Sequence, residues 1–436
     1  MHPRLRWTKT RWLYIPLGLW VGALLAILLG FAAYSILFVR RQIVEYHMGH
    51  QFSVHDPAFI GSVHALADPL PVDGNKIDLL QNGGQIFPAM LAAIRSAKKS
   101  INFEAFLFES SSIGTQFREA LCERARAGVQ VRVLLDGVGS GSSLKSQDVD
   151  AFREGGCQFA YYHPTHTWRF DQLNRRSHRR VLVVDGKVGF TGGVGFADRW
   201  QGHADQPEHW RDVQARLEGP IVTRLQSAFQ KHWIKSGGDI IAGPDDYPLL
   251  PPAGNLKAQV IATESFSFAP LAFVQAVAFS SAEKSIFITN SYCAPSNAEV
   301  ALLCDAVKRG VTVRLLLPGT HNDQPLTKAA GRAAYGKLLQ GGVQIFEYEP
   351  AMIHTKTMVI DGMFSIFGTS NFDARSAQLN EEIDVTVYDA AFAQQMENIF
   401  VGDLRFSKPY RLDDFNRRGL WERFGEWIVL PFHSQM

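Results

Sequence analysis

An internal repeat constrains the fold of this chain more than any other feature of its sequence. Four short segments recur in the same order, at offsets between 176 and 186 residues. The recurring pairs are Ala97 to Ile101 with Ala282 to Ile286, Gly128 to Leu135 with Gly310 to Leu317, Gly155 to Phe159 with Gly341 to Ile345, and Val183 to Gly186 with Val359 to Gly362. A repeat of this length is a whole domain rather than a solenoid unit. The chain is therefore predicted to contain two copies of one fold, with a shared cleft between them.

Each copy alternates helical segments with short apolar runs, which predicts an α/β fold in which helices pack on a sheet. The expected elements are helices at 84–98 and 114–127 with strands at 100–108 and 129–135, and helices at 270–283 and 297–309 with strands at 285–292 and 311–317. The runs at 180–184 and 357–360 end in Asp-Gly, which predicts a turn into another strand. We expect a linker at 42–76, the first copy at 77–245, and the second copy with a C-terminal tail at 246–436.

The N-terminal segment carries no charged residue between Trp12 and Val39. As a helix this stretch would extend roughly 40 Å, enough to cross a bilayer with some tilt. The basic residues on its two sides are Arg4, Arg6, Lys9 and Arg11 before it, and Arg40 and Arg41 after it. This asymmetry predicts that residues 1–41 form a cytoplasmic N-terminus and a transmembrane anchor, with the body outside. A cleaved signal peptide is the alternative, although its apolar region is usually shorter.

Charge and cysteine content limit the classes of function. The chain has 44 basic and 42 acidic side chains, a formal net charge of +2. This balance gives no support to a broad nucleic-acid-binding surface, which normally shows a strong basic excess, so no nucleic-acid partner is expected. The four cysteines are not spaced like a zinc site or a redox pair, so we expect them to be small buried apolar residues.

The residues that suggest chemistry occur at matching positions in the two copies. They are His178, Arg180 and Asp185 in the first copy, and His354, Lys356 and Asp361 in the second. Residues i and i+2 of a strand point to the same face, so each histidine should lie beside a cation. A cation that holds phosphate oxygens next to an imidazole that attacks phosphorus or carries a proton suits phosphate chemistry. The two aspartates precede glycine, so both a chemical role and a structural turn role stay open.

These motifs resemble the phospholipase D superfamily, whose signature is H-x-K-x4-D in two copies. Gly368-Thr-Ser370-Asn371 resembles the phosphate-contacting stretch of that superfamily. Over roughly residues 77 to 436 the chain is similar, more specifically, to bacterial cardiolipin synthases. The segments that carry this likeness are Trp210 to Asp212 with Gly219-Pro220, Leu316 to Gly319 with Asn322-Asp323, Asp373 to Ser376 with Leu379 to Glu382, and Trp421 to Arg423 with Leu430-Pro431.

The resemblance implies a site, a mechanism and partners. It implies that Asp212 and Glu382 orient the histidines, and that Ser370 and Asn371 contact phosphate. The implied reaction needs no metal and no cofactor: one histidine forms a phosphohistidine, and the other protonates the leaving group. By the same analogy His178 is the expected nucleophile. The expected enzyme is a cardiolipin synthase-like phosphatidyltransferase of the bacterial inner membrane that acts on membrane phospholipids, with phosphatidylglycerol as acceptor and its body on the periplasmic side.

Two alternatives stay open, and the first copy departs from the motif twice. A phospholipase D-type hydrolase would use water as the acceptor, and a divergent membrane protein would only bind lipid. Arg180 occupies the position of the motif lysine, and Gly195 occupies the position where asparagine is usual. Arginine keeps the charge but is bulkier, whereas glycine removes a side-chain donor. These departures predict that the two half-sites are not equivalent.

Overall fold

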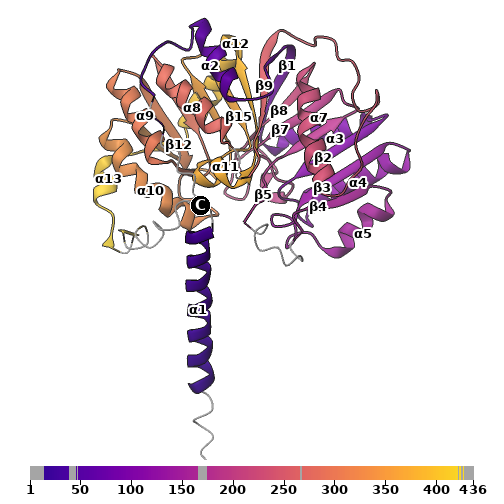
Figure 1. The fold of residues 1–436 in the computed structure, drawn as a ribbon, viewed down its shortest axis with the longest axis horizontal. Coiled ribbons are helices and arrows are strands. Elements are labelled where there is room, and N and C mark those ends of the chain that lie inside the picture. Colours follow the sequence, from indigo (N-terminus) through magenta and orange to yellow (C-terminus); the bar gives the residue numbers. More distant parts are fainter. Residues whose placement is uncertain are drawn as a thin grey trace, which may run out of the picture. The chain divides into compact units, whose positions relative to one another are not determined.

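A computed structural model of the chain describes residues 14–38, 46, 48–164, 174–265, 268–420, 422, 423 and 426. Met1–His47 and Met48–Met436 form two separate compact units. The first unit contains α1 (Tyr14–Phe38), an apolar helix (Figure 1). Across the part of the chain with described side chains, no helix is both long and apolar enough to cross a membrane, so the anchor stays a prediction. The basic residues expected to flank it lie outside the described residues.

The second unit is built on one continuous sheet to which both copies contribute strands in the same order. From the centre outward the first copy gives β1 (Val72–Gln81), β8 (Val213–Glu218), β7 (Val188–Gly192), β6 (Val181–Val184), β2 (Ser100–Ala105), β3 (Gln130–Asp136) and β4 (Gln158–Tyr162). The second gives β9 (Leu256–Ala262), β18 (Ile383–Tyr388), β15 (Phe364–Gly368), β14 (Thr357–Ile360), β10 (Ser285–Thr289), β12 (Thr312–Pro318), β13 (Gln344–Tyr348) and the edge strand β19 (Ser407–Tyr410). The copies meet where β1 pairs antiparallel with β9. The sheet therefore has the pseudo-twofold arrangement that the repeat predicts.

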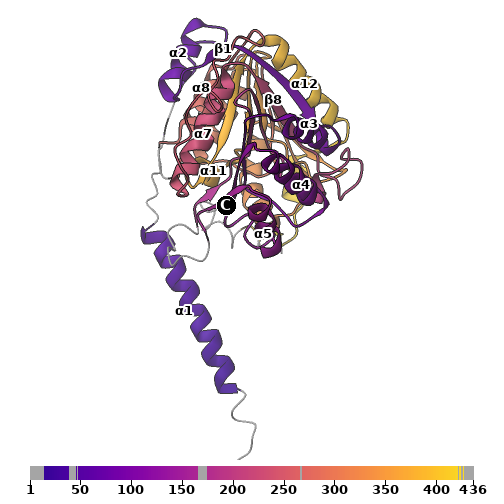
Figure 2. The same ribbon diagram turned by 90° about the vertical axis from the view of Figure 1, so that its right-hand side faces the viewer.

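Helices cover both faces of this sheet (Figures 1 and 2). The first copy has α3 (Asn82–Ser96), α4 (Ser112–Arg126), α5 (Ser146–Glu154) and α7 (Ile221–Lys235), preceded by α2 (Pro57–Leu66). The second has α8 (Pro270–Ser281), α9 (Asn297–Lys308), α10 (Pro325–Gln340), α11 (Ala374–Gln378), α12 (Ala390–Leu404) and α13 (Leu412–Asn416). The four helices predicted from sequence begin and end within a few residues of α3, α4, α8 and α9. Local capping agrees with these starts, since Ser111 caps α4 and Ser296 forms a capping box on α9.

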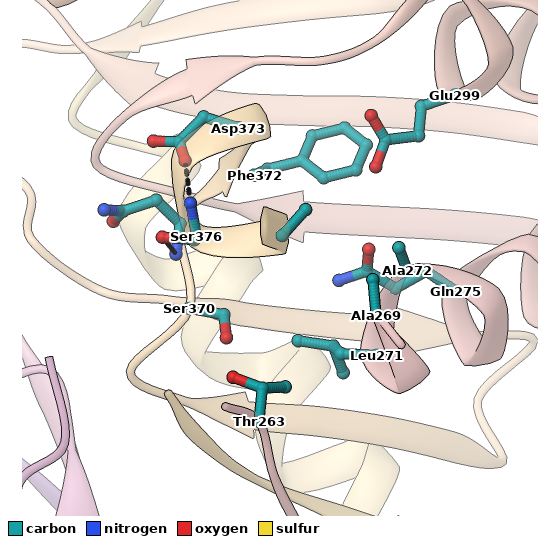
Figure 3. A pocket seen from close by; sticks show the side chains of 12 residues that line it. Thr263, Ala269, Leu271, Ala272, Gln275, Glu299, Ser370, Phe372, Asp373 and Ser376 are labelled. Carbon is teal, nitrogen blue, oxygen red and sulfur yellow. Dashed lines mark hydrogen bonds between the residues drawn. The ribbon is translucent and has the colours of Figure 1, made fainter. Parts of the chain in front are cut away.

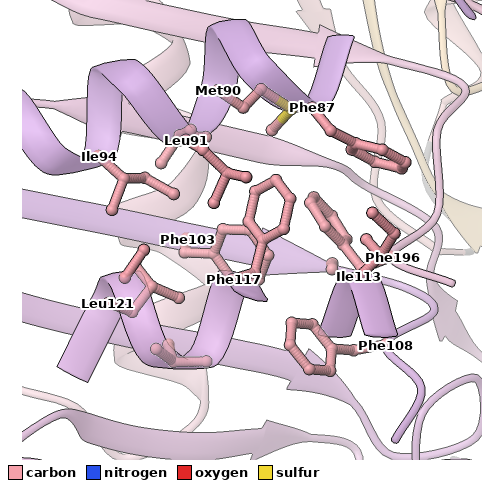
Figure 4. Packing of buried hydrophobic residues seen from close by; sticks show 14 of the residues in the cluster. Phe87, Met90, Leu91, Ile94, Phe103, Phe108, Ile113, Phe117, Leu121 and Phe196 are labelled. Carbon is pink, nitrogen blue, oxygen red and sulfur yellow. The ribbon is translucent and has the colours of Figure 1, made fainter. Parts of the chain in front are cut away.

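Apolar cores hold the layers of the sheet and helices together. On the α3 and α4 face, Phe103 of β2 packs against Phe117 and Phe196 with ring centroids 6.3 and 4.7 Å apart (Figure 4). On the other face, the core draws on α7, α12 and strands of both copies, including Phe229 and Phe392. Burying such side chains contributes about 25 cal/mol per Å² of apolar surface, so this shared core favours the joined sheet over separate halves.

The two predicted Asp-Gly turns are present. β6 turns into β7, with Val184 opposite Val188, and β14 turns into β15. Asp185 and Asp361 have φ of 52° and 53°, and the glycines after them have φ of 60°. Aspartate tolerates this left-handed conformation and glycine adopts it without steric cost, which explains the dipeptide at both turns.

Candidate active site

His178 follows a short strand that pairs across the two copies. β5 (Arg176–Ser177) runs parallel to β17 (Asn380–Glu381), and the backbone N–H of His178 donates to the carbonyl of Glu381 at 2.9 Å. Residues 178–180 are not part of a strand of their own copy, because β6 begins at Val181. The expected strand through His178 is thus corrected: this segment pairs with the opposite copy.

The second histidine is held in the same way. Arg211 forms a parallel bridge with Ile353, and the backbone N–H of His354 donates to the carbonyl of Arg211 at 2.7 Å. The strand expected through His354 also begins later, at Thr357. The backbone of each histidine is therefore hydrogen-bonded to the other copy, at the residue just before the candidate orienting carboxylate.

The carboxylates that contact the histidines are exchanged between the copies. His178 Nδ1 lies 2.9 Å from Glu382 Oε2, and His354 Nδ1 lies 2.9 Å from Asp212 Oδ2. A carboxylate at Nδ1 fixes the imidazole tautomer with its proton on that nitrogen and leaves the Nε2 lone pair available. The family resemblance implies that these two acids orient histidines, and the tertiary structure shows which acid contacts which histidine. Neither copy contains a complete histidine–carboxylate pair.

A cation lies beside each Nε2 atom. Arg180 donates to the carbonyl of His178 at 2.6 Å and has a second guanidinium nitrogen 3.1 Å from His178 Nε2. Lys356 Nζ lies 3.2 Å from His354 Nε2 and donates to Ser291 Oγ at 2.6 Å. Both cations are at least 96 % buried. Among the described residues neither forms an ion pair, and Arg180 Nε has no hydrogen-bond partner. An unpaired buried cation is unfavourable, so this site favours an anionic ligand.

Burial keeps both imidazoles neutral at physiological pH. Burial, helped by Arg180, lowers the pKa of His178 to about 4, although Glu382 opposes the shift. Burial and Lys356 lower the pKa of His354 to about 4, and Asp212 opposes this. A neutral Nε2 is the form that can attack phosphorus or accept a proton. A bound phosphodiester would add negative charge beside both rings, which favours the protonated form that a general acid requires.

Lys356 should give the reaction a basic limb in its pH profile. Burial lowers the pKa of this ammonium group to about 7. Below that pH the group is charged and attracts the phosphodiester, whose negative charge does not change in this range. We therefore expect kcat/KM, which reports the free enzyme, to fall as the pH rises through about 7. Lys356→Arg should remove this limb, because arginine stays protonated. A limb that persists in this variant would assign the titration to another group.

Asp185 and Asp361 are not brought to the histidines. The Asp185 carboxylate accepts the backbone N–H groups of residues 98–100 at 2.7 to 3.1 Å. Asp361 accepts those of residues 283–285 at 2.8 Å. Five residues of extended chain, roughly 16 Å, separate Asp185 from the cation at position 180. We propose that both aspartates stabilise the junction between a helix and the next strand rather than take part in chemistry.

Ser370 and Asn371 lie behind the second half-site. The Ser370 hydroxyl donates to Asp384, so it supports a buried carboxylate. Asn371 Oδ1 accepts from Ser291 Oγ at 3.3 Å, and that serine accepts from Lys356. Beside Asn371 is a small pocket whose lining includes Gln275 (Figure 3). None of the residues lining this pocket is a histidine or a cation, so it is not the reaction centre.

Trp200 accounts for the glycine at position 195. Gly195 and Trp200 are each 176 residues before Asn371 and Ser376 of the second copy. The Trp200 ring fills the space that a side chain at 195 would need, since a Cβ there would be 2.8 Å from it. Its indole N–H donates to Asp212 Oδ2 at 2.9 Å, so the tryptophan also supplies a donor to the orienting carboxylate. The lost asparagine is thus replaced by a different contact, which sequence comparison of the two copies had not revealed.

Gly195→Asn should therefore destabilise the protein, even though it restores the asparagine that is usual at this position of the motif. We expect a loss of roughly 1–3 kcal/mol in the free energy of unfolding, because the new side chain overpacks the Trp200 ring. The double variant with Trp200→Ser removes this overlap but leaves a cavity in place of a buried tryptophan, so it should stay less stable than the wild type. Thermal unfolding of both variants measures this. A stable Gly195→Asn protein would contradict the packing argument.

The residue before each orienting carboxylate is anchored by a buried ion pair, with the charges reversed between the copies. Glu381 Oε2 lies 2.5 Å from His232 Nε2 on α7, and Arg211 Nε donates to Asp403 Oδ1 on α12 at 2.8 Å. His232 Nδ1 also lies 2.6 Å from Glu104, so both ring nitrogens face carboxylates. These anchors position Glu382 and Asp212 from behind.

His232→Leu should destabilise the protein strongly. The substitution leaves two buried carboxylates, Glu104 and Glu381, without their common partner, and breaking a buried pair typically costs about 3–5 kcal/mol. Lys235→Leu is a matched control on the same helix, because its ion pair with Glu264 is exposed and contributes at most about 1 kcal/mol. Denaturant unfolding compares the two. Equal losses would show that the buried network does not carry the stability.

Comparison with known proteins agrees with this geometry. The family model described as "Cardiolipin synthase, PLD-like domain" matches residues 90–233 and 276–404, which is more than half of the chain. The chain belongs to this family. It is thus an enzyme of the phospholipase D superfamily, of the phosphatidyltransferase type. The first matched segment lies in the first half of the sheet and the second in the second half, and β1, β9 and β19 lie outside both.

Individual relatives support the family assignment. The probable cardiolipin synthase YwiE of Bacillus subtilis (strain 168) is 32% identical over 360 residues, which cover 82% of this chain and 72% of the relative. Cardiolipin synthase A of Pseudomonas syringae pv. syringae (strain B728a) is 33% identical over 362 residues, covering 81% and 72%. The crystal structure of phosphatidylserine synthase from Haemophilus influenzae Rd KW20 covers 86% of this chain and 98% of its own with a TM-score of 0.63. At 12% identity, that likeness shows the fold alone.

Proposed function

We propose that this member of the cardiolipin synthase family transfers a phosphatidyl group to the glycerol hydroxyl of phosphatidylglycerol. The observation that carries the proposal is the buried pair of half-sites, each with a neutral imidazole, a carboxylate on Nδ1 and a cation beside Nε2. Such a site holds a phosphodiester anion between two groups that can each attack or carry a proton. The names of the relatives support cardiolipin as the product.

In the proposed first step, His178 Nε2 attacks the phosphorus of a donor phosphatidylglycerol. The new P–N bond forms as the P–O bond to the glycerol head group breaks, and the leaving alkoxide takes a proton from His354. Arg180 and Lys356 hold the phosphate oxygens and stabilise the charge that develops on them. Glu382 supports the positive charge that the nucleophilic ring acquires, and Asp212 holds the ring of the acid.

In the second step, His354 accepts a proton from the hydroxyl of the acceptor lipid. The hydroxyl oxygen attacks phosphorus, the P–N bond breaks, and His178 is regenerated. Two phosphatidylglycerol molecules thus give one cardiolipin and one glycerol. Water as the acceptor would instead give phosphatidic acid. In these two steps every bond that forms or breaks and every proton that moves is accounted for by His178, His354 and the two lipid molecules.

One experiment tests the product. The full-length protein is incubated with phosphatidylglycerol in mixed micelles, and the lipids are separated. Cardiolipin together with an equal amount of free glycerol is the expected result. Phosphatidic acid in place of cardiolipin would make the protein a hydrolase, and no product with any common phospholipid would favour a binding protein without catalysis.

We also propose that the uncharged N-terminal segment holds the enzyme at a bacterial inner membrane, with the body on the periplasmic side. The support is the distribution of charge around that segment. Extraction with alkaline buffer, followed by protease treatment of spheroplasts, tests both parts. Release of the protein by alkali would refute the anchor, and protection from protease would reverse the orientation.

A further inference from the structure

Arg176 lies on the same side of its strand as the catalytic histidine His178. Ser177 between them points the other way, where its hydroxyl donates to Glu104 at 2.6 Å in the buried interior. Alternate residues of an extended strand face the same side, and their Cα atoms are about 6.6 Å apart. The side chain of Arg176 is therefore expected on the same side of the strand as His178.

A second arginine reaches the same place from the other copy. Arg375 of α11 donates through one guanidinium nitrogen to the carbonyl and to the side-chain oxygen of Asn174, both at 3.0 Å. Asn174 is two residues before Arg176. Burial and the nearby charge of Arg176 lower the pKa of Arg375 to about 10, which agrees with two guanidinium groups in close proximity.

The charge of Arg176 is not neutralised within the described part of the chain. Its guanidinium makes no hydrogen bond or ion pair there, and its Nε atom is buried without a partner. Asp136 is the acid whose charge acts on Arg176, and Asp373 is one whose charge acts on Arg375. Both already accept backbone N–H groups, of residues 138, 139 and 177 in the first case and of Ser376 in the second. Burial raises the pKa of each acid to about 7, which further reduces its negative charge.

The pseudo-symmetric position shows that this cation pair is not a requirement of the fold. Arg199 corresponds to Arg375 across the repeat, and it forms an ion pair with Glu109. Met352 corresponds to Arg176. One side of the reaction centre thus has one arginine and a neutral methionine, whereas the other side has two arginines.

We propose that Arg176 and Arg375 bind the phosphate of the acceptor lipid, while the histidine centre holds the phosphate of the donor. This inference rests on the proposed transfer to phosphatidylglycerol. In that acceptor only three carbon atoms separate the attacking hydroxyl from the phosphate, so the second phosphate must bind beside the reaction centre. Guanidinium groups match a phosphodiester well, because their planar donors can bond two oxygens at once.

The test compares two acceptors that differ in having a phosphate. Full-length enzyme in phosphatidylglycerol micelles is assayed for cardiolipin and, in parallel, for incorporation of isotope-labelled free glycerol into phosphatidylglycerol. Arg176→Gln and Arg375→Gln should each lower cardiolipin formation roughly tenfold or more, since each removes a charge-assisted contact. Exchange of free glycerol should stay within about twofold of the wild-type rate. Arg176→Lys, which keeps the charge, should recover part of the loss.

Controls separate this inference from folding and from the proposed function. Arg153→Gln removes an exposed arginine of α5 and should change neither reaction. The retained glycerol exchange reports a folded reaction centre in each variant. Equal loss of both reactions in the arginine variants, or loss of neither, would overturn the acceptor site alone, provided that the wild type makes cardiolipin. A wild type that exchanges glycerol but makes no cardiolipin would overturn both the acceptor site and the proposed function.

Discussion

His178→Ala and His354→Ala are each expected to lower the rate of cardiolipin formation by at least about ten-thousand-fold, because catalytic groups that act as a unit lose most of the rate when either is removed. Without His178 no phosphohistidine can form. Without His354 the alkoxide leaves without a proton and the acceptor hydroxyl is not activated. Initial rates of cardiolipin formation measure the effect. His55→Ala, an exposed histidine near α2, is the control and should have the wild-type rate.

A donor with a better leaving group distinguishes the two histidines. A phosphatidyl ester of p-nitrophenol releases an anion that needs no proton. His354→Ala should therefore release one equivalent of p-nitrophenol and accumulate phosphatidyl-histidine, whereas His178→Ala should release none. The opposite pattern would make His354 the nucleophile. Rapid release by both variants would exclude the covalent mechanism.

Glu382→Gln and Asp212→Asn should each reduce cardiolipin formation by about a hundred- to ten-thousand-fold, since an amide in place of the carboxylate permits the wrong imidazole tautomer. Both substitutions keep the shape of the side chain. Glu382 contacts His178 and Asp212 contacts His354, so the first substitution should impair the nucleophile and the second the group that carries the proton. Asp78→Asn, which changes a partly exposed carboxylate, should have little effect on the rate.

The p-nitrophenyl donor also tests whether the carboxylates are exchanged. Glu382→Gln should behave like His178→Ala and fail to release p-nitrophenol at an appreciable rate. Asp212→Asn should behave like His354→Ala and release one equivalent. If instead the Asp212 variant loses the first step, each carboxylate serves the histidine of its own copy, which would contradict the contacts in this structure.

The exchange of carboxylates predicts that activity requires the joined sheet. A single copy contains a histidine and a cation, but its own acid points to the other histidine. The backbone of each histidine segment is also paired with the other copy, through β5 and β17 in one case and Arg211 in the other. The active site therefore depends on the shared core that α7 and α12 help to form.

Much of this arrangement was already predictable from the residues themselves. The repeat of segments such as Gly128 to Leu135 predicted two copies of one fold. The alternation of helical and short apolar stretches predicted that this fold is α/β, because hydrophobic periodicity reflects which local element can bury its apolar face. The Asp-Gly dipeptides predicted both turns, because few other residues adopt a positive φ. Matching positions of His178 and His354 predicted a site at the centre of a duplicated fold. These properties depend on short stretches of chain, so one sequence contains enough information for them.

Other features depend on contacts between residues distant in sequence, and only the tertiary structure decided them. The sequence identified Asp212 and Glu382 but not their partners, since the crossing depends on how β5 meets β17. In the sequence Gly195 counts only as the loss of a side-chain donor, because the Trp200 ring that occupies this space is recognisable only in three dimensions. The sequence left Asp185 open between turn and chemistry, and the structure places its carboxylate at a helix–strand junction. Glu381 and Arg211 are each held by a partner of opposite charge on α7 or α12, but the signs are reversed between the two copies. The contact therefore recurs in the structure while the residue types differ, so no repeated sequence motif could reveal it.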